Sequence, residues 1–167
     1  MIADASVLIV FARAERLPLL LGTVGKVHVT RDVIAEAVDS AGQCPDAQAI
    51  ARAVEEGDLV VVAVRKGGVD GVRGRYPNLG RGEASVIAAG LQRKAHAVLM
   101  DERAARRAAS LEGLRPVGSL GVLARAWHAG RFNSRGELSA ALQELLEAGL
   151  WVAPDVVEAF WQGVGGR

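Results

Sequence analysis

Short apolar blocks alternate with amphipathic helical segments along most of this chain, and that alternation constrains the fold more than any other feature. The blocks include LVVVAV at 59–64 and AVLM at 97–100. Between them lie longer segments in which apolar residues recur at helical spacing. This arrangement is typical of parallel strands joined by crossover helices, so we expect an α/β fold.

The same patterns predict where the elements lie. The expected strands cover 1–3, 27–29, 59–64, 97–100 and 114–117. The expected helices cover 6–14, 17–22, 31–38, 46–55, 83–94, 102–111, 120–130, 135–149 and 154–162. Thr30 and Ser134 are predicted N-caps, because their hydroxyl groups can accept from the first free backbone N–H groups of a helix. The glycine-rich, basic stretch 65–82 shows no helical period and is predicted to be a mobile loop.

Composition excludes several classes of protein. Cys44 is the sole cysteine, which rules out an internal disulfide and a zinc site of paired cysteines. No apolar stretch has membrane-spanning length and the start lacks a basic leader, so we expect a cytoplasmic protein without membrane contact. The net charge of +1 and the aromatic content of 4% argue against binding nucleic acid by bulk attraction or base stacking.

Two aspartates directly follow expected strands. Asp4 follows the first strand and Asp101 follows AVLM, so both should lie at the carboxyl edge of the sheet, where α/β proteins place their sites. For either aspartate alone, capping of the next helix is the preferred interpretation. The pair together favours a functional site.

Two glutamates on predicted helices point to the same edge. Glu83 lies in register with Ile87 and Leu91 on an apolar stripe, and a carboxylate there needs a partner. A first-turn acid bonded to free N–H groups is an equally good interpretation of Glu83. Glu36 comes three residues after Val33 and, taken alone, reads as a solvated side chain.

Carboxylates crowded together repel one another unless a cation neutralises them. Mg²⁺ or Mn²⁺ is the expected cofactor, because hard cations prefer carboxylate oxygens and water. The three histidines show no mutual spacing typical of metal ligands, which disfavours zinc and a histidine base; they are His28, His96 and His128.

Five blocks occur in an order that resembles the PIN-domain family. They are IADASVLI, VIAEAV, LGRGEASVIAAG, VLMDERAARRAA and PVGSLGVLARA. The resemblance spans about 1–130 and is closest to the toxin nucleases of toxin–antitoxin pairs. It implies a three-layer α/β/α fold with a central, mostly parallel sheet in a domain at 1–130. Residues 131–167 are then expected to form a C-terminal helical extension.

The resemblance also implies a metal-dependent ribonuclease. Its metal-binding and catalytic acids would be Asp4, Glu36, Glu83 and Asp101, with Mg²⁺ or Mn²⁺ orienting a water for in-line attack on the phosphodiester. Ser6 and Ser119 match hydroxyl positions of the family, although a serine before a helix is commonly an N-cap. The implied partners are RNA, a small antitoxin protein and a second copy of the chain.

Several arginines are candidates for contacts with RNA phosphates, because a guanidinium fork suits phosphate oxygens. Those on the glycine-rich stretch are preferred, since its glycines let the chain mould to a ligand. For those on the helix after Asp101, a solvated face is an equally good interpretation. The candidates are Arg73, Arg75, Arg81, Arg103, Arg106 and Arg107.

Two other classes of function fit parts of the pattern. A catalytically silent PIN-like module would keep the fold for binding RNA or protein, and it predicts no cleavage in the presence of metal. A phospho-accepting signalling domain also gathers aspartates around Mg²⁺. That class needs an aspartate after the central strand and a lysine near the last strand, and the segments VAVRKGG and RPVGSLG do not supply them.

Overall fold

A five-stranded parallel sheet forms the centre of the molecule. The structure is a computed structural model, which describes residues 1–39, 42 and 44–165. Its strands are β1 (Ile2–Ala3), β2 (Val27–Thr30), β3 (Leu59–Val62), β4 (Val98–Leu99) and β5 (Pro116–Val117). They pair in the order β3-β2-β1-β4-β5, and every neighbouring pair is parallel. The predicted α/β class is confirmed.

Helices connect all of these strands, and further helices follow β5. The described residues form α1 (Ala5–Arg13), α2 (Leu17–Val24), α3 (Arg31–Ile34), a π-helical turn η1 (Ala35–Asp39), α4 (Pro45–Glu55), α5 (Gly68–Arg75), α6 (Arg81–Arg93), α7 (Arg103–Leu111), α8 (Ser119–His128), α9 (Arg135–Glu147) and α10 (Pro154–Gly163). As predicted, the Thr30 hydroxyl accepts from the N–H of Val33, and the Ser134 hydroxyl accepts from the N–H of Glu137. The expected helix at 31–38 is divided between α3 and η1.

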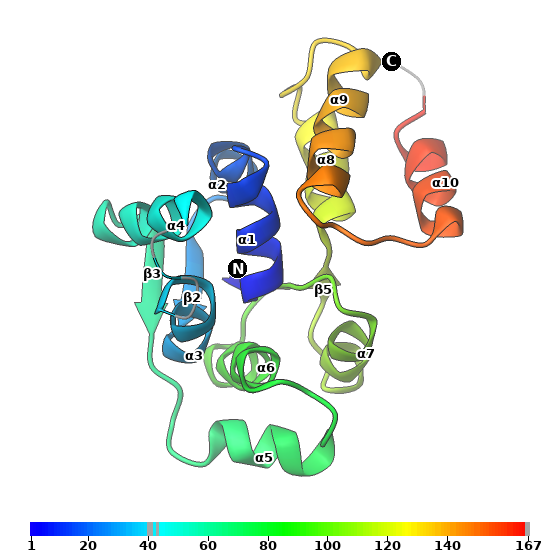
Figure 1. Cartoon of the computed structure of the whole chain (residues 1–167). Helices are drawn as coiled ribbons and strands as arrows, with labels where there is room; N and C mark the ends of the chain where they lie inside the picture. The colour runs from blue at the N-terminus through cyan, green and yellow to red at the C-terminus, as the bar shows by residue number, and fades with distance from the viewer. Residues whose placement is uncertain (40–41, 43, 166–167) are drawn as a thin grey trace.

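The helices pack on both faces of the sheet, which gives three α/β/α layers. The connections from β1 through β2 to β3 carry α1, α2 and α4, and α1 packs against α4. The connections from β3 to β4 and from β4 to β5 carry α6 and α7. Because crossovers between parallel strands are right-handed, opposite directions of travel place these two sets on opposite faces. Figure 1 shows α1, α2 and α4 on one side of the strands and α5, α6 and α7 on the other.

The direction of the chain across the sheet reverses between β1 and β4. From β1 the chain moves outward through β2 to β3, then crosses to β4 on the other side of β1 and continues to β5. Such a reversal leaves a crevice beyond the carboxyl ends of the two central strands. Asp4 and Asp101 follow those ends.

The predicted mobile loop at 65–82 is wrong in its middle part, where the chain forms α5. Its apolar residues Val69 and Val72 are buried, and α5 packs against α6. Residues three apart lie on one face of a helix, so this pair supplies a single apolar stripe. Packing of that stripe offsets the weak helix propensity of the glycines at 68, 71 and 74.

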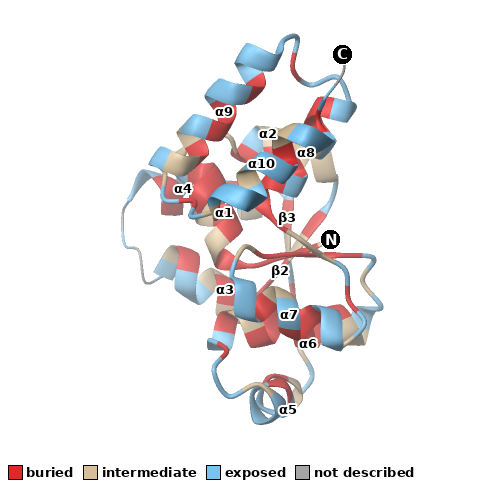
Figure 2. Cartoon of the chain, turned by 90° about the vertical axis from the view of Figure 1, so that its right-hand side faces the viewer, coloured by how far each residue is buried: buried red, intermediate tan, exposed pale blue. Residues whose placement is uncertain are grey.

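The last three helices gather beside α1 and α2. Contacts join α8 to α2, α9 to both α8 and α1, and α10 to α8. Figure 2 shows buried residues along the strands and the inward sides of helices, with exposed residues on the outward sides. Among the described residues no helix has both the length and the apolar character needed to span a membrane.

Candidate active site at the carboxyl ends of β1 and β4

The backbone at the end of β1 fixes the position of Asp4. The Asp4 N–H donates to the carbonyl of Leu99 at 2.9 Å, which locks this residue beside β4. Its backbone is extended, and α1 begins at the next residue. The side chain therefore leaves the sheet at its carboxyl edge, as the sequence predicted.

Asp4 is a buried carboxylate with one oxygen left unbonded. Its exposed fraction is 4%. The Ser6 hydroxyl donates to Oδ2 at 2.9 Å, whereas Oδ1 has no hydrogen-bond partner among the described residues. Burial, reinforced by the nearby charges of Glu83 and Glu36, raises the pKa of Asp4 from 3.8 to about 6, against the opposing effect of the Ser6 bond. Such an orphaned buried oxygen is suited to binding a cation.

Gly82 leaves the space in which Glu36 approaches Asp4. A β-carbon at Gly82 would overlap Oε2 of Glu36 and lie 3.7 Å from Oδ1 of Asp4. Glu36 itself is on η1 and exposed. The two carboxylates thus border one small space beside the start of α6, which only a residue without a side chain keeps open.

Glu83 lies in the first turn of α6 and is half-buried. Its carboxylate accepts from the Gly80 N–H at 2.8 Å, which is the first-turn role considered as one interpretation of this residue. Burial and the charges of Glu102 and Glu36 raise the pKa of Glu83, in spite of the bond from Gly80. Glu83 therefore caps the helix and also belongs to a cluster of like charges.

A buried chain of hydroxyl groups holds the start of α6 against the end of β2. The Thr30 and Ser85 oxygens lie 2.5 Å apart, and the Ser85 hydroxyl donates to the Gly82 carbonyl at 2.6 Å. Thr30 also accepts from the N–H of Val33, so its own hydrogen is free to point to Ser85. This chain fixes Gly82, and with it the approach of Glu36 and Asp4.

Asp101 has its carboxylate bonded to the first residue of α8. The Ser119 N–H donates to Oδ1 at 2.7 Å and the Ser119 hydroxyl donates to Oδ2 at 2.6 Å. Burial raises the pKa of Asp101, and these two bonds oppose the rise. The serine that the resemblance placed near the site thus contacts its fourth acid directly.

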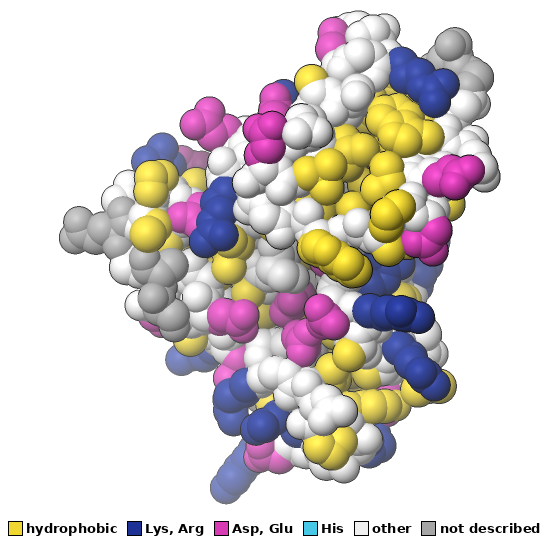
Figure 3. Space-filling model, turned by 45° about the vertical axis from the view of Figure 1, so that its right-hand side comes forward, with side chains coloured by type: hydrophobic (Ala, Val, Ile, Leu, Met, Phe, Trp, Pro, Cys, Tyr) yellow, Lys and Arg dark blue, Asp and Glu magenta, His cyan; other side chains and the backbone are white. Residues whose placement is uncertain are grey.

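The structure brings three of the four predicted acids into one group. We call Asp4, Glu36 and Glu83 the acidic group, because the charges of Glu36 and Glu83 both act on Asp4. Asp101 lies at the adjacent strand end and is engaged with Ser119. Among the described residues no three side chains of the His, Cys, Asp or Glu type are close enough to hold a metal ion together. Figure 3 shows acidic side chains gathered on one face, with lysine or arginine side chains beside them.

Sequence reasoning missed two members of the site. Glu102 contributes charge to the environment of Glu83, and its place directly after the strand-end Asp101 was a usable signal. Gly82 matters for the space it leaves, and a glycine at the end of a predicted loop gives no such indication from sequence. The role of Gly82 depends on Glu36 of η1, which lies between β2 and β3, whereas Gly82 lies between β3 and β4.

Two of the predicted phosphate contacts are held by ion pairs. Arg75 lies on α5 and its Nε is 2.7 Å from a carboxylate oxygen of Glu112. Arg81 begins α6 and its Nε is 2.6 Å from Asp32. Both arginines are on helices, so the expectation that this stretch is a loop able to mould to a ligand is wrong at these two positions. Phosphate binding by the arginine candidates stays a prediction, and Arg73 and Arg103 are exposed.

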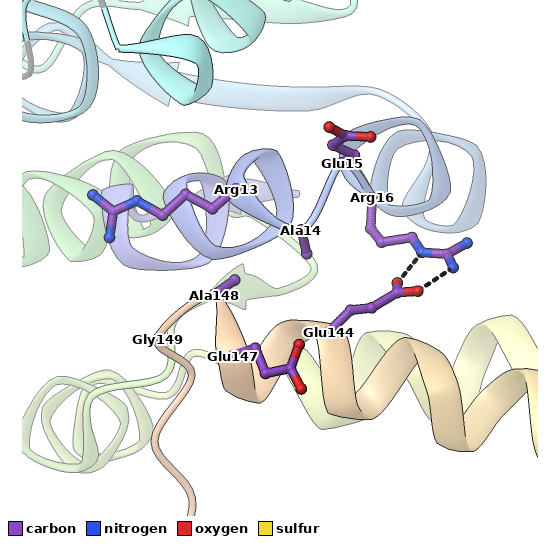
Figure 4. A pocket seen from close by; sticks show the side chains of 8 residues that line it. All are labelled: Arg13, Ala14, Glu15, Arg16, Glu144, Glu147, Ala148 and Gly149. Atoms are coloured by element: carbon purple, nitrogen blue, oxygen red, sulfur yellow. Dashed lines mark hydrogen bonds and ion pairs between the residues drawn. The ribbon is translucent and has the colours of Figure 1, made fainter.

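A cavity of about 910 Å³ lies away from the acidic group. Figure 4 shows its lining, which comes from the end of α1, the residues after it and the end of α9. Inside it Arg16 makes two hydrogen bonds to Glu144, at 2.6 and 3.0 Å. The pair satisfies both of its charges and joins α9 to the residues that follow α1, so its role in this cavity is structural.

The donors at the carboxyl edge are all oxygen atoms, and this chemistry fits Mg²⁺ or Mn²⁺ better than zinc. The unbonded Oδ1 of Asp4, its two carboxylate neighbours and the space at Gly82 provide the fit. Each oxygen of Asp101 has one hydrogen bond and a remaining lone pair. These residues therefore supply oxygen ligands of the kind that Mg²⁺ or Mn²⁺ prefers, although no three of their side chains, among the described residues, lie close enough to hold one ion together.

Comparison with known proteins gives one match. A family model described as a PIN domain matches residues 1–165. No curated protein and no solved structure matches the chain. The match continues past residue 130, the predicted end of the PIN-like domain, through most of the predicted extension at 131–167.

Proposed function

Because the chain belongs to the PIN-domain family, whose fold is of the nuclease type, we propose that it is a metal-dependent ribonuclease that hydrolyses RNA phosphodiester bonds. The observation that carries the proposal is Oδ1 of Asp4, a buried carboxylate oxygen without a hydrogen-bond partner among the described residues. Two further carboxylates add negative charge around it. A protein gains no stability from such an arrangement, and a bound cation would offset its cost.

We assign the roles by burial and hydrogen bonding. Asp4 is the principal ligand, because it is the most buried of the acids and has a free oxygen. Glu83 and Glu36 complete the acidic group, Glu36 from the solvent side. Asp101 contributes from the neighbouring strand end, where Ser119 orients it. Ser6 plays the corresponding part for Asp4.

A bound Mg²⁺ or Mn²⁺ would supply a Lewis acid that lowers the pKa of a water and offsets charge on the phosphate. The chain itself supplies a proton acceptor. Burial and like charge raise the pKa of Glu83, which makes its carboxylate a better base than an ordinary surface glutamate. Its half-buried position leaves it accessible to a substrate water.

Cleavage of a mixed RNA pool tests the proposal. The wild type is expected to cut RNA with Mg²⁺ or Mn²⁺ and to stop when a chelator is added. Asp4→Asn and Asp101→Asn should each reduce the rate by about 100-fold or more, because loss of a metal ligand removes several kcal/mol of transition-state stabilisation. Asp155→Asn is the matched control, since Asp155 lies in the first turn of α10 and is exposed.

The control should cut RNA like the wild type. Cleavage that persists with chelator, or that is as fast in both site variants as in the wild type, would refute the metal-dependent mechanism. Circular dichroism spectra of each variant must match the wild type before the rates are compared.

A catalytically silent RNA-binding or protein-binding module is the second candidate. It is favoured by the engagement of both Asp101 oxygens with Ser119 and by the lack of three converging ligands among the described residues. The same assay separates the two candidates. Folded wild type that binds RNA and leaves it intact with either metal would establish the silent module.

The biological setting that we propose is the toxin component of a toxin–antitoxin pair, in the cytoplasm. Its support is the resemblance to toxin nucleases, which also suggests a homodimer and a small antitoxin protein as partners. Light scattering over a range of protein concentrations tests the homodimer. Loss of RNA cleavage on co-expression with the product of an adjacent gene tests the antitoxin.

A further inference from the structure

Arg106 is set apart from the other arginines of α7 by its burial. It is half-buried, whereas Arg103 and Arg107 on the same helix are exposed. Along α7 it lies between Ala105 and Ala109, both of which are buried. The helix begins two residues after Asp101, so Arg106 lies one turn away from the end of β4.

Gly118 provides the space that the Arg106 guanidinium occupies. A β-carbon at Gly118 would overlap Nη1 of Arg106 and lie 2.9 Å from Oδ1 of Asp101. The backbone of Gly118 is extended, with φ −93° and ψ 175°, so its conformation does not require glycine. The missing side chain instead allows a guanidinium and a carboxylate to border the same point.

No carboxylate among the described residues forms an ion pair with Arg106. Among the described residues Arg106 has no ion pair within 4.0 Å, unlike Arg75 and Arg81. Its nearest acid, Asp101, takes its hydrogen bonds from Ser119. The proximity of the positive charge still helps to lower the pKa of Asp101, opposing the effect of burial.

A half-buried guanidinium beside the Asp101 carboxylate, with no hydrogen-bond or ion-pair partner among the described residues, is suited to bind an anion. We propose that Arg106 binds a phosphate of the RNA strand that crosses the site and thereby positions that strand over Asp4 and Asp101. A guanidinium presents a fork of N–H donors that matches two phosphate oxygens. This inference rests on the proposed function, because it takes RNA to be the substrate.

RNA binding without cleavage tests Arg106 separately from the chemistry. The probe is a short, fluorescein-labelled, single-stranded RNA of mixed sequence, and binding is followed by fluorescence anisotropy in full-length Asp4→Asn protein. In that background Arg106→Gln should weaken binding by about 10-fold, as expected for losing a charged hydrogen-bonded contact. Arg103→Gln is the matched control from the same helix and should weaken binding by less than about 3-fold.

The dependence of affinity on KCl concentration identifies a phosphate contact. Arg106→Gln should reduce the slope of log affinity against log salt by about 0.7, the contribution of one phosphate on a single strand. A purely structural role for Arg106 would leave that slope unchanged. Arg106→Lys should retain the slope and lose part of the affinity, because it keeps the charge without the fork. Gly118→Ala, which displaces the guanidinium, should resemble Arg106→Gln.

Three results would overturn the inference. They are an unchanged salt slope in Arg106→Gln, an equal loss of affinity in Arg103→Gln, and failure of the folded Asp4→Asn protein to bind the RNA at all. Failure of the proposed function is distinguishable from these. If wild type leaves RNA intact while Arg106→Gln weakens binding as described, the phosphate contact stands and the nuclease activity does not.

Discussion

The ends of β1 and β4 are neighbours in the sheet and both carry an aspartate, but the two aspartates are held differently. Asp4 is buried, accepts one bond from Ser6 and keeps Oδ1 unbonded. Asp101 is more open, and both of its oxygens accept from Ser119. The less solvated carboxylate is therefore the less satisfied one. Solvation costs alone would produce the opposite arrangement.

This difference teaches that position at a strand end does not by itself identify a functional acid. Asp101 resembles a helix-capping residue, because its carboxylate accepts hydrogen bonds from the first residue of α8. Asp4 directly precedes α1, yet its side chain makes no capping bond to the backbone of that helix. Burial combined with a missing partner distinguishes the acid that needs a ligand.

The largest expected consequence of the comparison is a pH-dependent stability due to Asp4. The folded pKa of Asp4 is about 6 and its ordinary value is 3.8. Between these values the folded protein keeps a proton that the unfolded chain has lost, so the free energy of unfolding falls as pH rises. For metal-free protein the fall should reach about 3 kcal/mol by pH 7, and it should level off above the folded pKa.

Urea denaturation at a series of pH values, with chelator present, measures that fall. Asp4→Asn should show a smaller fall over the same range, because Glu83 and Asp101, whose pKa values are also raised, still titrate. Added Mg²⁺ should restore stability to the wild type at neutral pH. A wild type whose stability rises between pH 4 and 6 would show that Asp4 is not the strained acid of the pair.

The next largest effect separates the two serines. Ser119→Ala should lower the free energy of unfolding at pH 7 by about 2 kcal/mol, because it removes a bond to a carboxylate from a buried donor. Ser6→Ala should lower the free energy of unfolding by less, because Asp4 can remain protonated and then no buried charge is left without its hydrogen bond. Its signature is an upward shift of the pH at which the decline in stability levels off, because loss of the Ser6 bond raises the folded pKa of Asp4 further. Equal losses without that shift would contradict the comparison.

The smallest effect concerns the space between Asp4 and Glu36. Gly82→Ala places a methyl group against Oε2 of Glu36 and should weaken Mn²⁺ binding by about 10-fold, as disturbed outer partners of metal sites generally do. Gly74→Ala on α5 is the matched control, because a β-carbon there meets no atom within 4 Å. Isothermal titration calorimetry measures both. Unaltered Mn²⁺ affinity in Gly82→Ala would refute the idea that the space between Asp4 and Glu36 contributes to metal binding.

Much of the fold was predictable from local patterns. The strands at 27–29 and 59–64 and the caps at Thr30 and Ser134 follow from apolar runs and hydroxyl residues, which act over a few positions. The helix α5 was not predictable in this way, because its stability comes from packing on α6 and not from its own glycine-rich sequence. Helix propensity alone predicted a loop at this position, whereas the tertiary contact between α5 and α6 stabilises a helix.

The site shows the same division. Asp4 and Asp101 were identified because each directly follows an apolar strand, and this property is visible in sequence. The contacts that define their surroundings join distant segments: Gly82 with Glu36, and Asp101 with Ser119. No local pattern encodes which segments meet, so the different states of the two aspartates emerged only from the structure.

The reversal of the sheet between β1 and β4 also affects how the protein is made. Ile2 pairs with His28 on one side and with Val98 on the other, so the second partner leaves the ribosome long after the first. Until β4 docks, the N–H of Asp4 lacks the carbonyl of Leu99 that fixes it, and Asp101 is absent from the crevice. If the proposed nuclease is assembled in this order, its site is incomplete until β4 has been made, while the messenger RNA that encodes it lies close by.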